Sequence, residues 1–206
     1  MSTSADGTAI PEPGWLVEFK EKFSSGLAHT FIIHGAVEDY VGDARVRLDH
    51  YLSETLGENR CVVFYNCSRG ISFAAPRHRA QFLAAVGLDG DGESGQPKAP
   101  AMNELFYPEP HKALPLLEQA LLAPQLRSGL AVIFEDPELI WPQSDYSHMG
   151  QADRLSLATL RRWARQSEFI AAGQVILLIT ATASDLHSSL RATSSMIETV
   201  EIPYPT

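Results

Sequence analysis

Short apolar runs constrain the fold of this chain more than any other feature of its sequence. Each run is nearly continuous rather than alternating, which is typical of strands buried on both faces of a parallel sheet. The segment IETVEIPYP adds a last strand near the end of the chain. The predicted strands lie at about 28–34, 61–67, 130–135, 174–183 and 197–205.

Segments with helical periodicity separate these runs. In the first segment, Trp15, Phe19, Phe23 and Leu27 recur every four residues, which is the apolar stripe of an amphipathic helix. Helices that alternate with buried strands imply right-handed crossovers and helices on both faces of the sheet. We therefore predict an α/β fold, a three-layer αβα sandwich around a five-stranded parallel sheet. The predicted helices cover about 15–27, 44–57, 76–86, 113–122 and 153–169.

The sequence predicts one domain with two flexible segments. Residues 1–14 are polar and contain prolines, so we expect a flexible tail before a single domain at 15–206. Residues 87–110 have four glycines, four prolines and no periodicity, which predicts a mobile surface insertion. Within the domain, we expect 30–34 to be a central strand with 174–182 beside it.

The charge balance bears on the class of partner. The net charge of −9 argues against nucleic acid as the main partner, because phosphate backbones require clustered Lys and Arg.

No apolar run approaches the roughly 20 residues of a membrane span, and no signal peptide is apparent, so we expect a cytoplasmic protein. Cys61 and Cys67 stand about 20 Å apart in an extended strand, so they cannot bridge and are expected to be reduced core thiols.

The segment TFIIHGAVEDYVGD, residues 30–43, begins like a phosphate-binding loop and then departs from it. A P-loop continues from strand and glycine to Gly-Lys-Ser/Thr, and no stretch of the chain matches that motif. After His34 and Gly35 the loop instead carries Glu38, Asp39 and Asp43. Like charges about 5 Å apart repel by about 3 kcal/mol at an effective dielectric of ~20, so the carboxylates of this loop would repel a triphosphate. Ordinary nucleotide binding there is not expected.

Each polar residue of this region has a functional and a plainer interpretation. Glu38 and Asp39 belong to an interacting or closing loop, whereas Asp43 is predicted to be the N-cap of the helix at 44–57. His34 either joins a metal or acid–base cluster or caps its strand with a hydrogen bond, and we favour the second.

The run VIFED, residues 132–136, ends in two acids. Apolar residues that lead into carboxylates at a strand end can position Mg²⁺, but such a pair is also a common solvated loop start. Glu135 and Asp136 would gather with Glu38 and Asp39 on one rim if the first and third strands were neighbours. Against a metal-dependent enzyme, no Lys or Arg that would hold a substrate stands nearby in the sequence.

The stretch LLITATASDLHSSLRATSSMIETVEIPYP, residues 177–205, resembles the second half of an AAA+ ATPase core, with VIFED in the place of its Walker B strand. The resemblance implies a P-loop NTPase-like sheet with the first strand in the middle, and a sensor residue at Thr180 or Ala181 with Thr182 beside it. Arg191 is the only guanidinium near the position of the intersubunit arginine. The resemblance also implies a helical lid after the last strand, and none is present by residue 206.

Three functions remain open from the sequence. The first is a non-catalytic AAA+-like module, with a degenerate phosphate loop, that assembles with or regulates a protein partner. That partner would be an AAA+ ATPase domain or a second copy, and no cofactor is expected. The second is a Mg²⁺-dependent phosphohydrolase that uses the acidic rim. The third is a working ATPase with an atypical phosphate loop, which would bind ATP and Mg²⁺ at Glu135 and Asp136.

Overall fold

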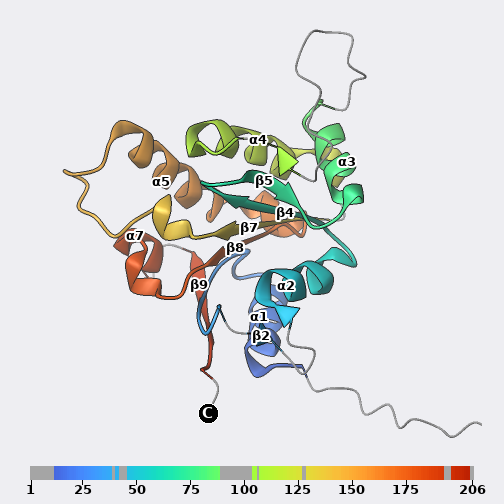
Figure 1. The fold of residues 1–206 in the computed structure, drawn as a ribbon, viewed down its shortest axis with the longest axis horizontal. Coiled ribbons are helices and arrows are strands. Elements are labelled where there is room, and N and C mark those ends of the chain that lie inside the picture. The colour runs from blue at the N-terminus through green and yellow to red at the C-terminus, as the bar shows by residue number, and fades with distance from the viewer. Residues whose placement is uncertain are drawn as a thin grey trace, which may run out of the picture.

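The computed structural model of the chain describes residues 12–38, 40–41, 46–88, 104–105, 107–126, 129–192 and 196–204. These residues form a twisted sheet with helices on both of its faces (Figure 1). The three-layer αβα architecture is therefore confirmed.

Seven strands make up the main sheet within the described residues, in the order β6-β5-β4-β7-β8-β1-β9. Five of them run parallel, as predicted, and two short antiparallel strands extend the sheet beyond β4. The parallel strands are β1 (Thr30–Gly35), β4 (Cys61–Asn66), β7 (Leu130–Glu135), β8 (Val175–Ile179) and β9 (Ile197–Ile202). The antiparallel strands are β5 (Gly70–Phe73) and β6 (Glu104–Leu105).

The order corrects two expectations about strand neighbours. Strand β1 does not lie in the middle of the sheet. It is the second strand from one edge, and β9 is the edge strand beside it. It is also not a neighbour of β7, because β8 lies between them and pairs with both. The expectation that 174–182 lies beside the first strand is confirmed, with Ile32 opposite Leu178.

Helices α1 and α2 cover one face of the sheet, and α3, α4 and α5 cover the other (Figure 1). Consecutive strand residues point to opposite layers, so in β1 the side chains of Phe31 and Ile33 join one core and Ile32 joins the other. All three are fully buried, which is why these strands are continuously apolar. The helices are α1 (Gly14–Ser24), α2 (Leu48–Gly57), α3 (Pro76–Ala85), α4 (Pro110–Leu122), α5 (Gln151–Trp163), α6 (Ser167–Ala171) and α7 (Ser188–Arg191).

The start of α2 differs from the prediction. A small antiparallel pair, β2 (Tyr40–Val41) with β3 (Val46–Arg47), precedes the helix, which begins at Leu48. Its N-cap residue is Arg47, so the prediction that Asp43 caps this helix is wrong. Asp43 itself lies outside the described residues, as do the tail at 1–11 and most of the insertion, 89–103.

The two cysteines do not form a disulfide. Both are free thiols, and burial raises the pKa of Cys61 to about 12. A thiol with that pKa stays protonated at neutral pH and is a poor nucleophile. None of the helices in the described part of the chain has the length and apolar character needed to cross a membrane.

Candidate functional site

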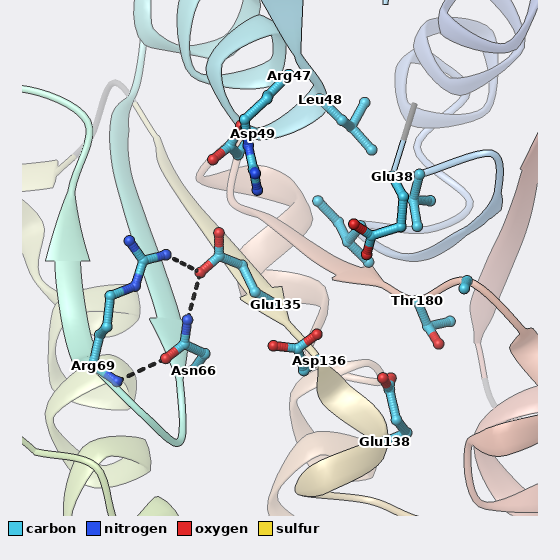
Figure 2. A pocket seen from close by; sticks show the side chains of 13 residues that line it. Glu38, Arg47, Leu48, Asp49, Asn66, Arg69, Glu135, Asp136, Glu138 and Thr180 are labelled. Carbon is cyan, nitrogen blue, oxygen red and sulfur yellow. Dashed lines mark hydrogen bonds and ion pairs between the residues drawn. The ribbon is translucent and has the colours of Figure 1, made fainter. Parts of the chain in front are cut away.

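A pocket of about 190 Å³ opens where the parallel strands end (Figure 2). Loops after β1, β4, β7 and β8 build it, together with the first turn of α2. In parallel α/β sheets the carboxyl ends of the strands are the usual place for a ligand. The lining residues are Val37, Glu38, Arg47, Leu48, Asp49, Asn66, Arg69, Glu135, Asp136, Glu138, Ile179, Thr180 and Ala181.

On the β1 side, three consecutive backbone amides are already hydrogen-bonded. Gly35 N–H donates to the carbonyl of Ala181 at 3.2 Å, and Ala36 N–H donates to the carbonyl of Ile202 at 3.0 Å. Val37 N–H donates back to the carbonyl of Gly35 at 2.7 Å. A phosphate-binding loop works because such amides are free to point at the anion. Here the first two amides bond β1 to the segments on either side of it, and the third closes a local turn.

Gly35 is the residue that permits this close packing. Its φ is +100°, a conformation that side chains rarely adopt. A Cβ atom at this position would lie 2.3 Å from the carbonyl oxygen of Ile202. The glycine that ends the first strand therefore permits the close contact between β1 and β9.

The first turn of α2 reaches the pocket with a carboxylate of its own. Asp49 Oδ1 accepts a hydrogen bond from the amide of His50 at 2.8 Å and lies 3.4 Å from Nε of Arg47. The positive end of the α2 dipole therefore already has a negative charge beside it, the carboxylate of Asp49. An added anion would have to compete with that carboxylate.

On the β4 and β7 side, side chains close the pocket. Glu135 Oε2 accepts from Asn66 Nδ2 at 2.7 Å and from Arg69 Nη2 at 2.8 Å (Figure 2). The carbonyl of the Asn66 side chain accepts from the amides of Ser68 and Arg69, at 3.1 and 2.8 Å. Asn66 is 7% exposed, so a buried amide organises the turn after β4 and aims Arg69 at Glu135. Charge-assisted bonds of this kind are stronger than neutral ones.

Three further acids lie around the cavity, namely Glu38, Asp136 and Glu138, and within the described part of the chain none of them has an ion-pair partner. Asp136 adopts a left-handed backbone conformation with φ of 51°, which Asp tolerates better than most residues. Glu138 Oε2 is buried without a hydrogen-bond partner among the described residues.

The structure brings some of the predicted residues together and separates others. Glu38, Glu135, Asp136 and Thr180 line the pocket, whereas Asp39 lies outside the described residues. Within the described residues, however, no group of three or more His, Cys, Asp or Glu side chains is placed to hold a metal ion.

The remaining predicted residues do not line the pocket. His34 pairs in register with Glu201 of β9, Gly35 belongs to the strand, and Thr182 is exposed. Thr180 is 3% exposed and donates its hydroxyl to the carbonyl of Thr182 at 3.4 Å. Arg191 is exposed and donates to the carbonyl of Leu186 at 3.3 Å, in keeping with a surface residue of a short helix.

Sequence reasoning missed half of the pocket. The expectation that no Arg stands near the acids is wrong, because Arg47 and Arg69 both line it. Asn66 and Glu138 were also missed. A signal for Asn66 existed, since an Asn at the end of an apolar strand, shortly before a polar turn, is a common turn organiser.

Comparison with known proteins matches the chain to a family. A family model described as the AAA+ chaperone, N-terminal Rossmann-like domain, matches residues 7–203. No curated protein matches.

Two solved structures are similar in fold. A chain of the E. coli MS115-1 HORMA:CdnC:Trip13 complex has 15% sequence identity and a TM-score of 0.44, over 95% of this chain and 58% of that chain. A chain in the structure of Drosophila ORC bound to DNA has 14% identity and a TM-score of 0.40, over 92% of each chain. This chain thus spans little more than half the length of the chain from the HORMA:CdnC:Trip13 complex.

Proposed function

This chain belongs to the AAA+ chaperone family, as the N-terminal Rossmann-like domain, and we propose that it is a non-catalytic module of that family. Its role would be to assemble with or regulate a protein partner through the pocket and the loop after β1. The partner would be an AAA+ ATPase domain or a second copy of the chain. The function of the phosphate loop would have been lost while its architecture remained.

The observation that supports this proposal most directly is that the backbone amides at the end of β1 are already hydrogen-bonded. Gly35, Ala36 and Val37 all donate to backbone carbonyls, so none of the three is available to a phosphate. In a P-loop a helix begins directly after the glycine-rich turn, and its N-terminus also faces the anion. Here α2 begins only at Leu48, after β2 and β3, and its first turn carries Asp49. Both sources of anion affinity are therefore lacking in the described loop.

The carboxylates of the pocket also fit Mg²⁺ poorly. One oxygen of Glu135 already accepts two hydrogen bonds, and one of these comes from the Arg69 guanidinium. A guanidinium 2.8 Å away repels a divalent cation and competes with it for the same oxygen. Mg²⁺ also demands near-octahedral oxygen ligands. This arrangement supports a binding module over the phosphohydrolase alternative.

Partner binding is supported by the acids that make no ion pair with any residue that the structure describes. Glu38, Asp136 and Glu138 surround the cavity and favour a partner with a basic surface. Such charges act mainly by raising the association rate and by setting orientation. We propose the loop at 34–43, with Glu38, Asp39 and Asp43, as the first point of contact.

Titration with nucleotide tests the proposal. We expect no change in Tm and no heat in calorimetry with ATP or ADP at millimolar concentration, with or without Mg²⁺. A ligand at one hundred times its Kd would add about 2.7 kcal/mol of stability, which a thermal scan detects. A reproducible Mg²⁺-dependent rise in Tm with ATP would overturn the proposal in favour of an ATPase. Heat from Mg²⁺ alone, with release of phosphate from a phosphomonoester, would favour the phosphohydrolase.

A further inference from the structure

Strand β9 forms one edge of the main sheet (Figure 1). In the described part of the chain it pairs with β1 alone, in parallel, from Thr30 opposite Ile197 to Gly35 opposite Ile202. It is six residues long, whereas β6 at the other edge has only two. Natural sheets usually shorten, cover or charge their edges, because unpaired N–H and C=O groups can pair with another chain. A six-residue edge therefore calls for an explanation.

The backbone groups of β9 divide between two sides. The carbonyl of Ile202 accepts from Ala36 N–H at 3.0 Å, so the polar groups of Ile202 face β1. Successive residues of a strand direct these groups to opposite sides, so 198, 200 and 202 face β1, and 197, 199 and 201 face away from it. A bond from Lys22 Nζ of α1 to the carbonyl of Thr199, at 2.8 Å, agrees with this assignment.

Lys22 protects only one of the outward groups. Its ammonium also lies 2.9 Å from Glu18 Oε1 and 3.4 Å from Glu198 Oε2, so three acceptors hold it at the edge. Lysine at an edge is a common means of discouraging strand pairing. The N–H groups of Thr199 and Glu201 and the carbonyl of Glu201, however, make no hydrogen bond with any described residue. Both residues are exposed, so an added strand would find two donors and one acceptor there.

The side chains of β9 differ between the two faces of the sheet. Val200 and Ile202 are buried in the core layer beneath α1 and α2, whereas Thr199 and Glu201 lie exposed on the other face. Glu198 is paired with Lys22, but Glu201 makes no ion pair within the described residues. An incoming strand would match both faces if apolar residues alternated with polar and basic ones.

We propose that the outward side of β9 receives an extended basic segment of a protein partner as an additional strand. In this mode of recognition, main-chain hydrogen bonds supply the affinity and alternate side chains supply the specificity. A Lys or Arg opposite Glu201 would add a cross-strand pair of opposite charge. The inference goes beyond the proposed function, because it uses the edge of the sheet rather than the strand-end pocket.

A second copy of the chain is a poorer occupant of this edge. Two β9 strands side by side would bring Glu198 and Glu201 of one copy close to those of the other, and like charges across neighbouring strands are destabilising. Each copy would also have to displace its own Lys22 from Thr199. The net charge of −9 opposes self-association as well, and it favours a basic segment.

A labelled peptide of sequence Lys-Val-Thr-Val-Lys-Val-Thr is a direct probe, with fluorescence anisotropy as the readout. Its valines would extend the layer of Val200 and Ile202, and its lysines and threonines would lie beside Glu201 and Thr199. We expect it to bind the unmodified chain. The same peptide with N-methylated backbone amides should not bind, because it keeps its side chains and charge but lacks the donors of a strand ladder.

Thr199→Pro tests the edge itself. The change removes an outward N–H and leaves the bonds to β1 in place, and proline is tolerated where a strand N–H faces solvent. The peptide should bind this variant about tenfold more weakly, and should bind the matched control Thr199→Val within about twofold of the unmodified chain. Thermal scans would establish that the variants remain folded. If the proline variant does not fold, Glu201→Lys serves instead, and charge reversal should weaken binding about tenfold.

Lys22→Ala tests the protection of the edge. It exposes the carbonyl of Thr199, so the peptide should bind severalfold more tightly. Lys20→Ala is the matched control, because it makes the same charge change on the same helix, where Lys20 pairs with Glu12 rather than with β9. That variant should bind the peptide as the unmodified chain does.

Three results would overturn this inference. The first is equal binding of the N-methylated and the unmethylated peptide, which would reduce the contact to charge attraction. The second is unchanged peptide binding by folded Thr199→Pro and Glu201→Lys variants. The third is a dimer in light scattering that Thr199→Pro dissociates while the peptide fails to bind, which would assign the edge to a second copy. None of these results depends on whether the strand-end pocket binds nucleotide.

Discussion

The two walls of the strand-end pocket are closed by different means. On the β1 wall, other main-chain groups satisfy the amides of residues 35–37, as in the bond from Ala36 N–H to the carbonyl of Ile202 at 3.0 Å. On the β4 and β7 wall, the polar groups are side chains, and Asn66 and Arg69 satisfy Glu135. On both walls, these polar groups are engaged in hydrogen bonds within the chain.

The difference shows which wall can be altered by substitution. Main-chain bonds of the β1 wall are part of the sheet, so they open only if the strands separate. The side-chain network of the opposite wall can be changed one residue at a time with limited damage. Nucleotide binding should therefore not be recovered by changes at Asn66, Arg69 or Glu135 alone. The predictions below test this contrast, from the largest expected effect to the smallest.

Gly35→Ala should lower the free energy of unfolding by about 3 kcal/mol or more, measured by urea denaturation. The new Cβ would meet the carbonyl oxygen of Ile202 at 2.3 Å, and neither atom can move without disturbing the pairing of β1 with β9. Gly173→Ala is the matched control, because Gly173 also has positive φ, +67°, but has nothing within 4 Å of an added Cβ. Its cost should be only about 1 kcal/mol. Equal costs would mean that backbone conformation, not the contact with β9, constrains Gly35.

Asn66→Ala should cost about 2 kcal/mol in the same assay. The change removes the acceptor for the amides of Ser68 and Arg69 and the donor to Glu135, and it does so at a buried position. Ser68→Ala removes only the hydroxyl contact to Asn66 at 3.0 Å and should cost much less. If the two variants were equally stable, the turn after β4 would not depend on Asn66.

Arg69→Ala should cost no more than about 0.5–1 kcal/mol, and the loss should shrink at high salt. The side chain of Arg69 is 52% exposed, so solvent screens much of its attraction to Glu135. The variant should still show no heat of Mg²⁺ binding, because Asn66 continues to hold Glu135. Measurable Mg²⁺ affinity in this variant would show that Arg69 alone keeps the metal out, and would weaken the contrast between the walls.

Glu38→Gln with Asp39→Asn should leave stability unchanged or slightly higher, within about 0.5 kcal/mol. No ion pair of Glu38 is present in the described part of the chain, and removing neighbouring like charges relieves repulsion. If a basic partner is found, the double change should slow association and flatten its salt dependence. Unfolding of the domain by this change would assign the loop a structural role instead.

Most of the fold was predictable because strand burial is encoded locally. The run CVVFY is apolar, and all six residues of β4, with Asn66 at its end, are buried in the structure. The extra strands β5 and β6 were not predicted, because strands of four and two residues have no period long enough to recognise. The start of α2 was placed too early, because β3, which pairs with β2, occupies residues that were expected to begin the helix.

The site was predictable only where its residues come from one strand end. Glu135 and Asp136 follow an apolar strand directly, so their place at the rim was visible in the sequence. Arg69 reaches Glu135 across a separation of 66 residues, and that contact exists only because β4 pairs with β7. Arg47 was missed because its segment was expected to be helical.

The sequence by itself determined the class of fold, the succession of buried strands along the chain and the lack of a Gly-Lys-Ser/Thr loop. These features depend on local composition, which is present before any long-range contact forms. The tertiary structure alone decided that the amides of Gly35 and Ala36 would be taken by Ala181 and Ile202. Hydrogen-bond partners so distant in sequence are chosen by strand order and register, and neither of these leaves a local trace in the chain.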